Sequence, residues 1–123
     1  MSDPYLKTLN ATLNTGDLSF GITLVVNGGV ITGDMISAKS FFKGFADTFA
    51  DAWPGGPNES IREGFGAWSE APNDSGLVED FIHLKNARYV NGKEMVPSTG
   101  TGMLWRGSLD SVSGFSLGSF NIN

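Results

Sequence analysis

Residues 18–37 read LSFGITLVVNGGVITGDMIS, and this stretch decides the fold. Its first half, residues 18–26, alternates large apolar positions with smaller ones, which is the two-residue period of a β-strand. Asn27-Gly28 follows, a pair that accepts the positive φ angles of a tight hairpin turn. A second strand over residues 30–37 is therefore expected to pair antiparallel with the first.

Helix signals flank this hairpin on both sides. Before it, Asp3-Pro4 combines a capping side chain with a proline suited to the first helical position, and leucines at helical spacing follow. After it, Ser37 and Asn58 can each cap a helix, with a proline- and glycine-rich break between the two helices. We therefore expect an N-terminal helix and a helical insertion over about residues 38–69.

Three further strands are expected in the C-terminal half. Residues 78–90 are expected to form a long strand that can contain a β-bulge. Residues 103–109 and 115–120 are expected to form two shorter strands. The order of elements predicts an α+β fold with the helical insertion between strands 2 and 3. Its core is either a bent five-stranded antiparallel sheet or a small barrel, since closure would hide the edge strands.

The composition excludes several classes of protein and several kinds of partner. The chain has 123 residues, of which 40% are hydrophobic, and no repeat or linker divides it, so a single domain over residues 1–123 is expected. It has no cysteine, which excludes disulfides and thiolate chemistry. Apolar runs are much shorter than the roughly 20 residues that cross a bilayer, and no secretory signal is visible. We expect a cytoplasmic protein without a membrane partner.

The charge is unevenly distributed along the chain. Residues 34–80 hold nine acids and three bases, whereas residues 81–123 hold four bases and two acids. The two parts therefore present different surfaces, which matters for assembly, although an acidic helical face can also be merely solvated. The overall net charge of −5 opposes binding of nucleic acid through its phosphates.

The sequence shows no constellation of residues that is typical of an enzyme. Its single histidine, His83, lies within an expected strand and is interpreted as a packed or surface residue of that strand rather than a catalyst. The acids do not follow the spacing of a calcium loop, and Asn27-Gly28-Gly29 lies between two strands rather than at a helix N-terminus. We therefore expect no catalytic residue, no metal and no cofactor.

The first helix of the insertion is the most informative part of the chain. Five aromatic residues line one side of it: Phe41, Phe42, Phe45, Phe49 and Trp53. Such a set either belongs to the core or remains partly exposed and meets a partner, because aromatic residues are favoured in interface centres. These five residues, together with Arg106, are the candidate partner-binding residues.

Five stretches of the chain carry a resemblance to a known family. They are LVVNGGVITG at 24–33, MISAK at 35–39, FIHLKN at 81–86, WRG at 105–107 and GFSLG at 114–118. In this order they resemble the gas-vesicle accessory protein GvpU family. The resemblance implies a non-enzymatic cytoplasmic protein that influences vesicle assembly or clustering. It implies partners among gas-vesicle proteins or on the vesicle surface, and we expect a homo-oligomer that presents the insertion helices.

A second resemblance concerns the fold. The strand, Asn-Gly turn and second strand, with LKNA at 84–87 and LWRG at 104–107, look like the two motif halves of Sm-like barrels. In Sm-like proteins the Arg-Gly pair helps to form an RNA pocket within a ring, and Arg106 and Gly107 are the matching positions. The alternative function is therefore an Sm-like oligomeric RNA-binding or general interaction module.

Overall fold

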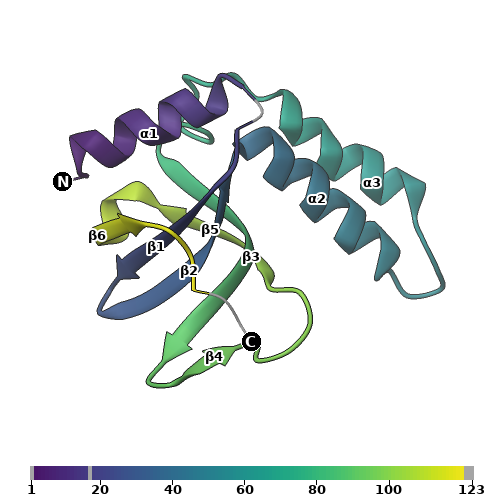
Figure 1. Ribbon diagram of the computed structural model, residues 1–123. Helices are drawn as coiled ribbons and strands as arrows, with labels where there is room; N and C mark the ends of the chain where they lie inside the picture. The colour runs from purple at the N-terminus through teal and green to yellow at the C-terminus, as the bar shows by residue number, and fades with distance from the viewer. Residues whose placement is uncertain (1, 17, 121–123) are drawn as a thin grey trace.

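The structure, a computed structural model, describes residues 2–16 and 18–120 and shows an α+β fold (Figure 1). Its helices are α1 (Pro4–Asn14), α2 (Ala38–Asp51) and α3 (Glu59–Gly66), with the short 3-10 helices η1 (Ala67–Glu70) and η2 (Leu109–Ser111). Its strands are β1 (Phe20–Val26), β2 (Gly29–Ile36), β3 (Phe81–Asn91), β4 (Glu94–Val96), β5 (Met103–Ser108) and β6 (Val112–Leu117).

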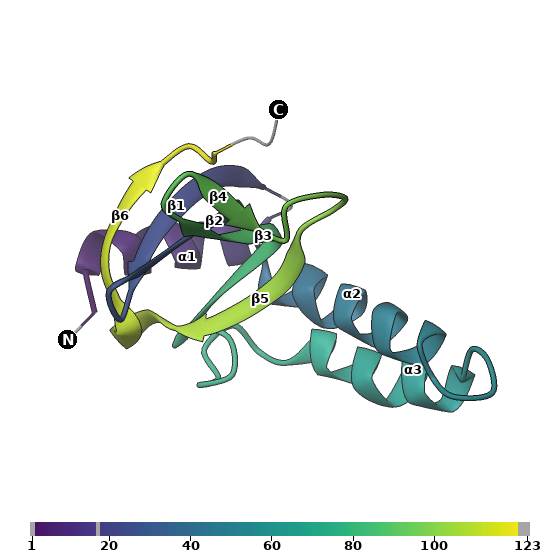
Figure 2. The same ribbon diagram turned by 90° about the horizontal axis from the view of Figure 1, so that it is seen from below.

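The strands form an antiparallel sheet in the order β4-β3-β2-β1-β6. The long strand β3 pairs with β2 along one side, and on its other side it pairs first with β5 and then with β4. Strands β5 and β6 follow each other in the chain, but they share no ladder in the part of the chain that the structure describes. The sheet is therefore open, as Figure 2 also shows.

Three details of the expected sheet are wrong. The closed Sm-like barrel does not form, because β5 and β6 remain unpaired with each other among the described residues. The sheet has six strands instead of five, since the three-residue strand β4 is too short to show a periodic pattern. The last strand spans Val112–Leu117 rather than 115–120, because Val26 of β1 pairs with Val112.

The β1–β2 hairpin forms as the sequence predicts. Asn27 and Gly28 have φ angles of 51° and 80°, and Val26 pairs with Gly29 across this two-residue turn. Both turn residues therefore have the positive φ that an Asn-Gly pair accepts at low cost. The turn sets the register in which the buried side chains of both strands reach the same face of the sheet.

Strand β3 contains a β-bulge, as its expected length allows. Asn86 has a φ of 53°, and the pairing register with β2 and with β5 shifts at this point. Gly33 lies opposite the bulge, where a Cβ atom would be only 3.0 Å from the Cα atom of Ala87. A side chain at this position would thus push the two strands apart, and the bulge bends β3 between its two partner strands.

The core lies between α1 and the sheet. It contains Leu6 and Leu13 from α1, together with Ile22, Leu24, Ile31, Met35, Ile82, Leu84, Ala87, Leu109 and Val112. The buried Asn10 attaches α1 to the sheet, because its Nδ2 donates to the backbone oxygen of Phe81 at 2.8 Å. Asp3 caps α1 as predicted, since its carboxylate accepts from the backbone N–H of Tyr5.

Helices α2 and α3 form a hairpin that projects from the sheet (Figures 1 and 2). The predicted caps are confirmed: Ser37 Oγ accepts from Ser40 N, and Asn58 Oδ1 accepts from Ile61 N, both at 3.1 Å. With η1, these helices form the expected insertion between strands 2 and 3.

Candidate functional site

The aromatic residues of the insertion form an exposed stripe. Phe41 is buried, with 6% of its surface exposed, and Phe42 is half-buried. The other members are exposed to between 37% and 48%, namely Phe45, Phe49 and Trp53 on and after α2, Phe65 on α3 and Trp68 on η1. These seven residues are called the aromatic stripe below.

Small residues at the contact between the two helices explain this exposure. Ala46 and Ala50 are the buried residues in the second half of α2, with 1% and 0% of their surfaces exposed. A Cβ atom at Gly66 would lie 3.8 Å from the Cβ of Ala46, so the helices approach closely there. The larger rings of α2, such as Phe45 and Phe49, are not enclosed at this contact; they pack against Phe65 of α3 and remain partly exposed.

The rings of the stripe are held against one another. Along α2, the ring centroids are 6.0 Å apart for Phe41 and Phe45, 6.0 Å for Phe45 and Phe49, and 5.6 Å for Phe49 and Trp53. Phe65 of α3 lies 6.2 Å from Phe45 and 5.1 Å from Phe49. These separations are typical of favourable aromatic pairs. A partner would therefore meet rings that are already ordered, which reduces the entropy lost on binding.

The base of the stripe contains a groove of about 360 Å³, called the aromatic groove below. Its lining is formed by Phe41, Phe42, Phe45, Phe65, Trp68 and Arg106. The structure thus brings four of the six predicted site residues together, and Phe49 and Trp53 extend the stripe outside the groove. Phe65 and Trp68 also belong to the site, although they are not among the residues predicted from the sequence. Their signal was the helical spacing that follows the Asn58 cap.

Arg106 reaches the groove from strand β5. Its Nη1 donates to the backbone oxygen of Leu77 at 2.9 Å and to Nε2 of His83. Its Cζ atom lies 3.8 Å from the ring centroid of Phe81 and 5.3 Å from that of Phe42, so the guanidinium stacks on aromatic rings. Burial lowers the pKa of Arg106. Among the described residues no carboxylate forms an ion pair with it.

His83 lies next to Arg106 and is a packed residue of strand β3; of the two positions left open by the sequence, packed or at the surface, it takes the packed one. It is fully buried, and its ring centroid lies 4.8 Å from that of Phe41 and 5.8 Å from that of Phe42. Burial, and then the nearby Arg106, lower the pKa of His83 to about 3. Because arginine only donates, Nε2 of the neutral ring must be the acceptor and Nδ1 carries the proton. Within residues 2–16 and 18–120, this Nδ1 has no hydrogen-bond partner.

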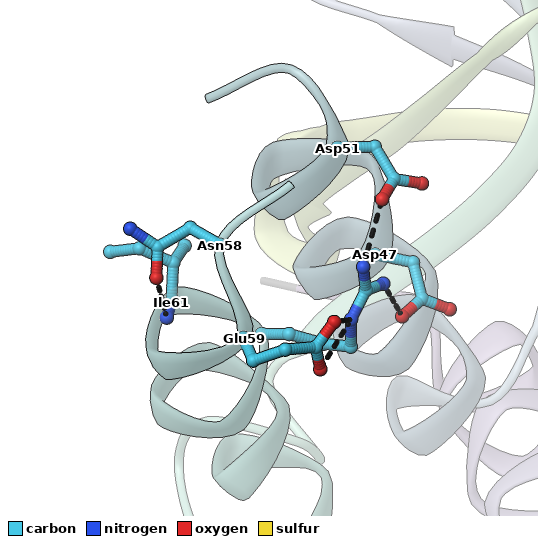
Figure 3. A network of polar contacts seen from close by, with 6 residues as sticks. Asp47, Asp51, Asn58, Glu59 and Ile61 are labelled. Carbon is cyan, nitrogen blue, oxygen red and sulfur yellow. Dashed lines mark hydrogen bonds and ion pairs between the residues drawn. The ribbon is translucent and has the colours of Figure 1, made fainter. Parts of the chain in front are cut away.

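A polar network fastens the two helices on the acidic side of the hairpin (Figure 3). Arg62 of α3 contacts Asp47 at 2.9 Å and Asp51 at 2.8 Å on α2, and Glu59 of its own helix at 3.3 Å. The hydrogen bonds from Asp51 and then Asp47 raise the pKa of Arg62 above its usual range. The network joins α2 to α3 and partly neutralises the acidic middle segment of the sequence.

A comparison with protein families identifies the chain. The family model described as "Gas vesicle protein GvpU-like" matches residues 3–120. The chain belongs to the GvpU-like family. The resemblance seen in five stretches of the sequence is therefore confirmed, and this family is one of gas vesicle accessory proteins. A comparison with curated proteins and another with solved structures give no match to this GvpU-like protein.

A second hollow of the GvpU-like protein, about 500 Å³ in volume, lies beside the aromatic groove. It is polar and lies between the end of α1, the start of α2 and the segment after η1. The first N–H groups of α2 are already bonded, since Ala38 N donates to Asn14 Oδ1 at 2.8 Å and Ser40 N donates to Ser37 Oγ. Two of the N–H groups in the first turn of α2 are therefore already engaged within the protein.

Residues 2–16 and 18–120 of the GvpU-like protein contain neither a metal site nor a membrane-spanning helix. No group of three or more His, Cys, Asp or Glu side chains is placed to hold a metal ion. No helix in these ranges combines the length and the apolar character needed to cross a membrane. The aromatic stripe, with Arg106, thus remains the candidate site.

Proposed function

We propose that this GvpU-like protein binds another protein of the gas vesicle through its aromatic stripe and groove, and in this way influences vesicle assembly or clustering. The observation that carries the proposal is the exposure of five large aromatic side chains on one side of the α2–α3 hairpin. Contiguous exposed apolar surface in a folded protein is typical of a binding site. Aromatic residues also dominate the binding energy of protein interfaces.

The chemistry of the groove supports binding rather than catalysis. Its lining combines five aromatic rings with one guanidinium, so it offers no nucleophile next to a base. His83, which contacts the lining residues Phe41, Phe42 and Arg106, is buried, and its Nε2 already accepts from Arg106. We therefore infer a non-enzymatic role that uses no cofactor.

We propose that a homo-oligomer carries several copies of the groove, one on each protomer. Clustering of vesicles requires more than one binding site, because a single site cannot bridge two surfaces. We expect the chain to act as one domain, to form a homo-oligomer in the cytoplasm and to associate there with gas vesicles. The contrast between the acidic insertion and the more basic C-terminal third favours such self-assembly. Light scattering that detects only monomers at every concentration would contradict the oligomer.

Co-flotation with purified gas vesicles tests the proposal. The protein is mixed with vesicles at several concentrations, the vesicles rise, and the protein in the buoyant layer is measured. We expect a Phe45→Ser and Trp68→Ser double variant to bind at least about tenfold more weakly, because it removes two candidate interface anchors. Both residues are more than 40% exposed, so the fold should tolerate the change, and circular dichroism checks this.

The matched control is Tyr5→Ser, which removes an aromatic ring that is 69% exposed on α1, outside the insertion. This variant should float with the vesicles as the unmodified protein does. The proposal fails if the unmodified protein stays below the vesicles. It also fails if the double variant binds as well as the control.

A further inference from the structure

Among the described residues that line the aromatic groove, Arg106 is the one cation. Only one of its three nitrogen atoms donates hydrogen bonds within the described part of the protein. Nη1 donates to Leu77 and to His83, whereas Nε and Nη2 have no hydrogen-bond partner among the described residues. The stacked rings of Phe81 and Phe42 lie against the guanidinium plane. The unused donors therefore lie along one edge of the guanidinium, between aromatic side chains.

We propose that the groove binds a protein segment in which a carboxylate stands next to apolar side chains, and that Arg106 pairs with this carboxylate through Nε and Nη2. The inference rests on the proposed function and specifies the partner of the same site. Two parallel N–H donors on one edge of a guanidinium match the two oxygens of a carboxylate. The apolar walls strengthen such a pair, because little water screens it there.

The surroundings of Arg106 favour an acidic partner. Burial removes part of the hydration of the charged guanidinium and lowers the pKa of Arg106. No carboxylate of the described residues pairs with Arg106 to compensate for this lost hydration. A partner carboxylate would supply this missing counter-charge, while apolar side chains beside it would cover the rings of Phe45, Phe65 and Trp68. Charge complementarity and apolar contact thus both point to an amphipathic acidic segment.

A nucleic acid fits this groove less well than an acidic protein segment does. Binding of a phosphate backbone depends on several lysines or arginines, and the groove lining contains a single one. A carboxylate contact is local and needs one well-placed guanidinium, which Arg106 provides.

His83 positions the guanidinium for this contact. It lies opposite Arg106 in the β3–β5 register, and its Nε2 accepts from Nη1. Because His83 is fully buried, it holds Nη1 on the inner side and leaves the Nε and Nη2 edge free for a partner. His83 is thus a positioning residue, and it does not itself touch the partner in this arrangement.

The experiment measures vesicle binding by flotation for four proteins. Arg106→Gln removes the charge, Arg106→Lys keeps the charge but loses the paired donors, and Lys43→Gln removes an exposed charge of α2 outside the groove lining. We expect Arg106→Gln to bind about tenfold more weakly or worse than the unmodified protein, and Arg106→Lys not to restore binding. Lys43→Gln should stay within about twofold.

A second arm changes the vesicles and leaves the unmodified protein as it is, so it does not depend on how the variants fold. Accessible carboxylates of purified gas vesicles are converted to neutral amides with a carbodiimide and glycinamide, and mock-treated vesicles are the control. Binding of the unmodified protein should fall to the level of Arg106→Gln. Binding of Arg106→Gln should not change, because its contact with the carboxylate is already lost.

The outcomes separate this inference from the proposed function. If Phe45→Ser with Trp68→Ser loses binding while Arg106→Gln binds like the unmodified protein, the groove binds a partner but the carboxylate contact is wrong. If amidation weakens both proteins equally, the inference is also overturned. If Arg106→Gln dissociates copies of this chain in sedimentation and leaves vesicle binding unchanged, the carboxylate belongs to a second copy and the proposed partner is wrong.

Discussion

The sheet with α1 and the α2–α3 hairpin use apolar residues in opposite ways. In the sheet and α1, aliphatic side chains such as Leu24 and Leu84 are fully buried. In the hairpin, α3 has no buried residue, and the buried positions in the second half of α2 are the alanines at 46 and 50. Large aromatic side chains of the hairpin remain exposed. Aromatic residues at helical spacing therefore do not by themselves indicate a core.

The largest effect should come from truncating a core residue of the sheet. Leu84→Ala should lower the free energy of unfolding by about 3 kcal/mol, because it leaves a cavity at a fully buried position. Phe49→Ala, on the exposed stripe, should lower it by about 1 kcal/mol or less. Urea unfolding followed by circular dichroism measures both values.

If the two losses of stability are equal, the contrast between the buried sheet and the exposed hairpin does not hold. Phe49 would then contribute to stability as a core residue does, and the stripe would be a second core rather than a binding surface. The slope of the unfolding free energy against urea concentration can also change in only one of the two variants. Such a change would indicate that the variant exposes a different amount of surface on unfolding or no longer unfolds in two states.

The second prediction concerns His83, which lies at the boundary between the two regions. Its pKa in the folded protein is about 3, below the ordinary value of 6.5, so the unfolded chain binds more protons between these pH values. The stability that depends on neutral His83 is therefore complete above about pH 6.5 and decreases as the pH falls toward 3. The expected slope is about 1.4 kcal/mol per pH unit.

His83→Gln should remove this component and keep a side-chain acceptor for Arg106. The other titrating groups are the same in both proteins, so the difference between their unfolding free energies isolates the contribution of His83. We expect this difference to change with the slope above between about pH 6 and pH 4, as measured by urea unfolding at each pH. Parallel curves would show that His83 is accessible to protons in the folded protein.

The smallest effect is expected from the network that joins α2 to α3. Arg62→Gln should lower the melting temperature only slightly at low salt, because ion pairs near the surface contribute little to stability. The difference should shrink in 1 M sodium chloride, since salt screens these charges. Lys43→Gln makes the same change in net charge outside this network and is the control. A difference that is independent of salt would mean that Arg62 acts through packing instead.

Much of the fold is predictable from short stretches of sequence. The Asn27-Gly28 turn and the caps at Ser37 and Asn58 depend on neighbouring residues, and all of them form as expected. The strand β4 could not be predicted in this way, because three residues are too few to show a period. The open sheet was also not predictable, since closure depends on how β5 and β6 lie relative to each other.

The candidate site is predictable from the sequence only in part. Helical spacing identifies the aromatic side of α2, but it does not say whether Phe45 and Phe49 are buried. Their exposure follows from the close approach of α3, which the small residues Ala46 and Gly66 permit. The resemblance to RNA-binding rings makes Arg106 a candidate, whereas in the structure it lines a groove together with aromatic rings.

The sequence by itself determined the features that depend on local backbone preference and on periodicity. These include the first hairpin, the caps of the helices, the helical insertion and the family to which the chain belongs. Only the tertiary structure decided which apolar side chains are buried, that the sheet stays open, and that Arg106 of β5 meets Phe42 of α2. The reason is that burial and contact depend on how distant segments pack, and local sequence does not encode that packing.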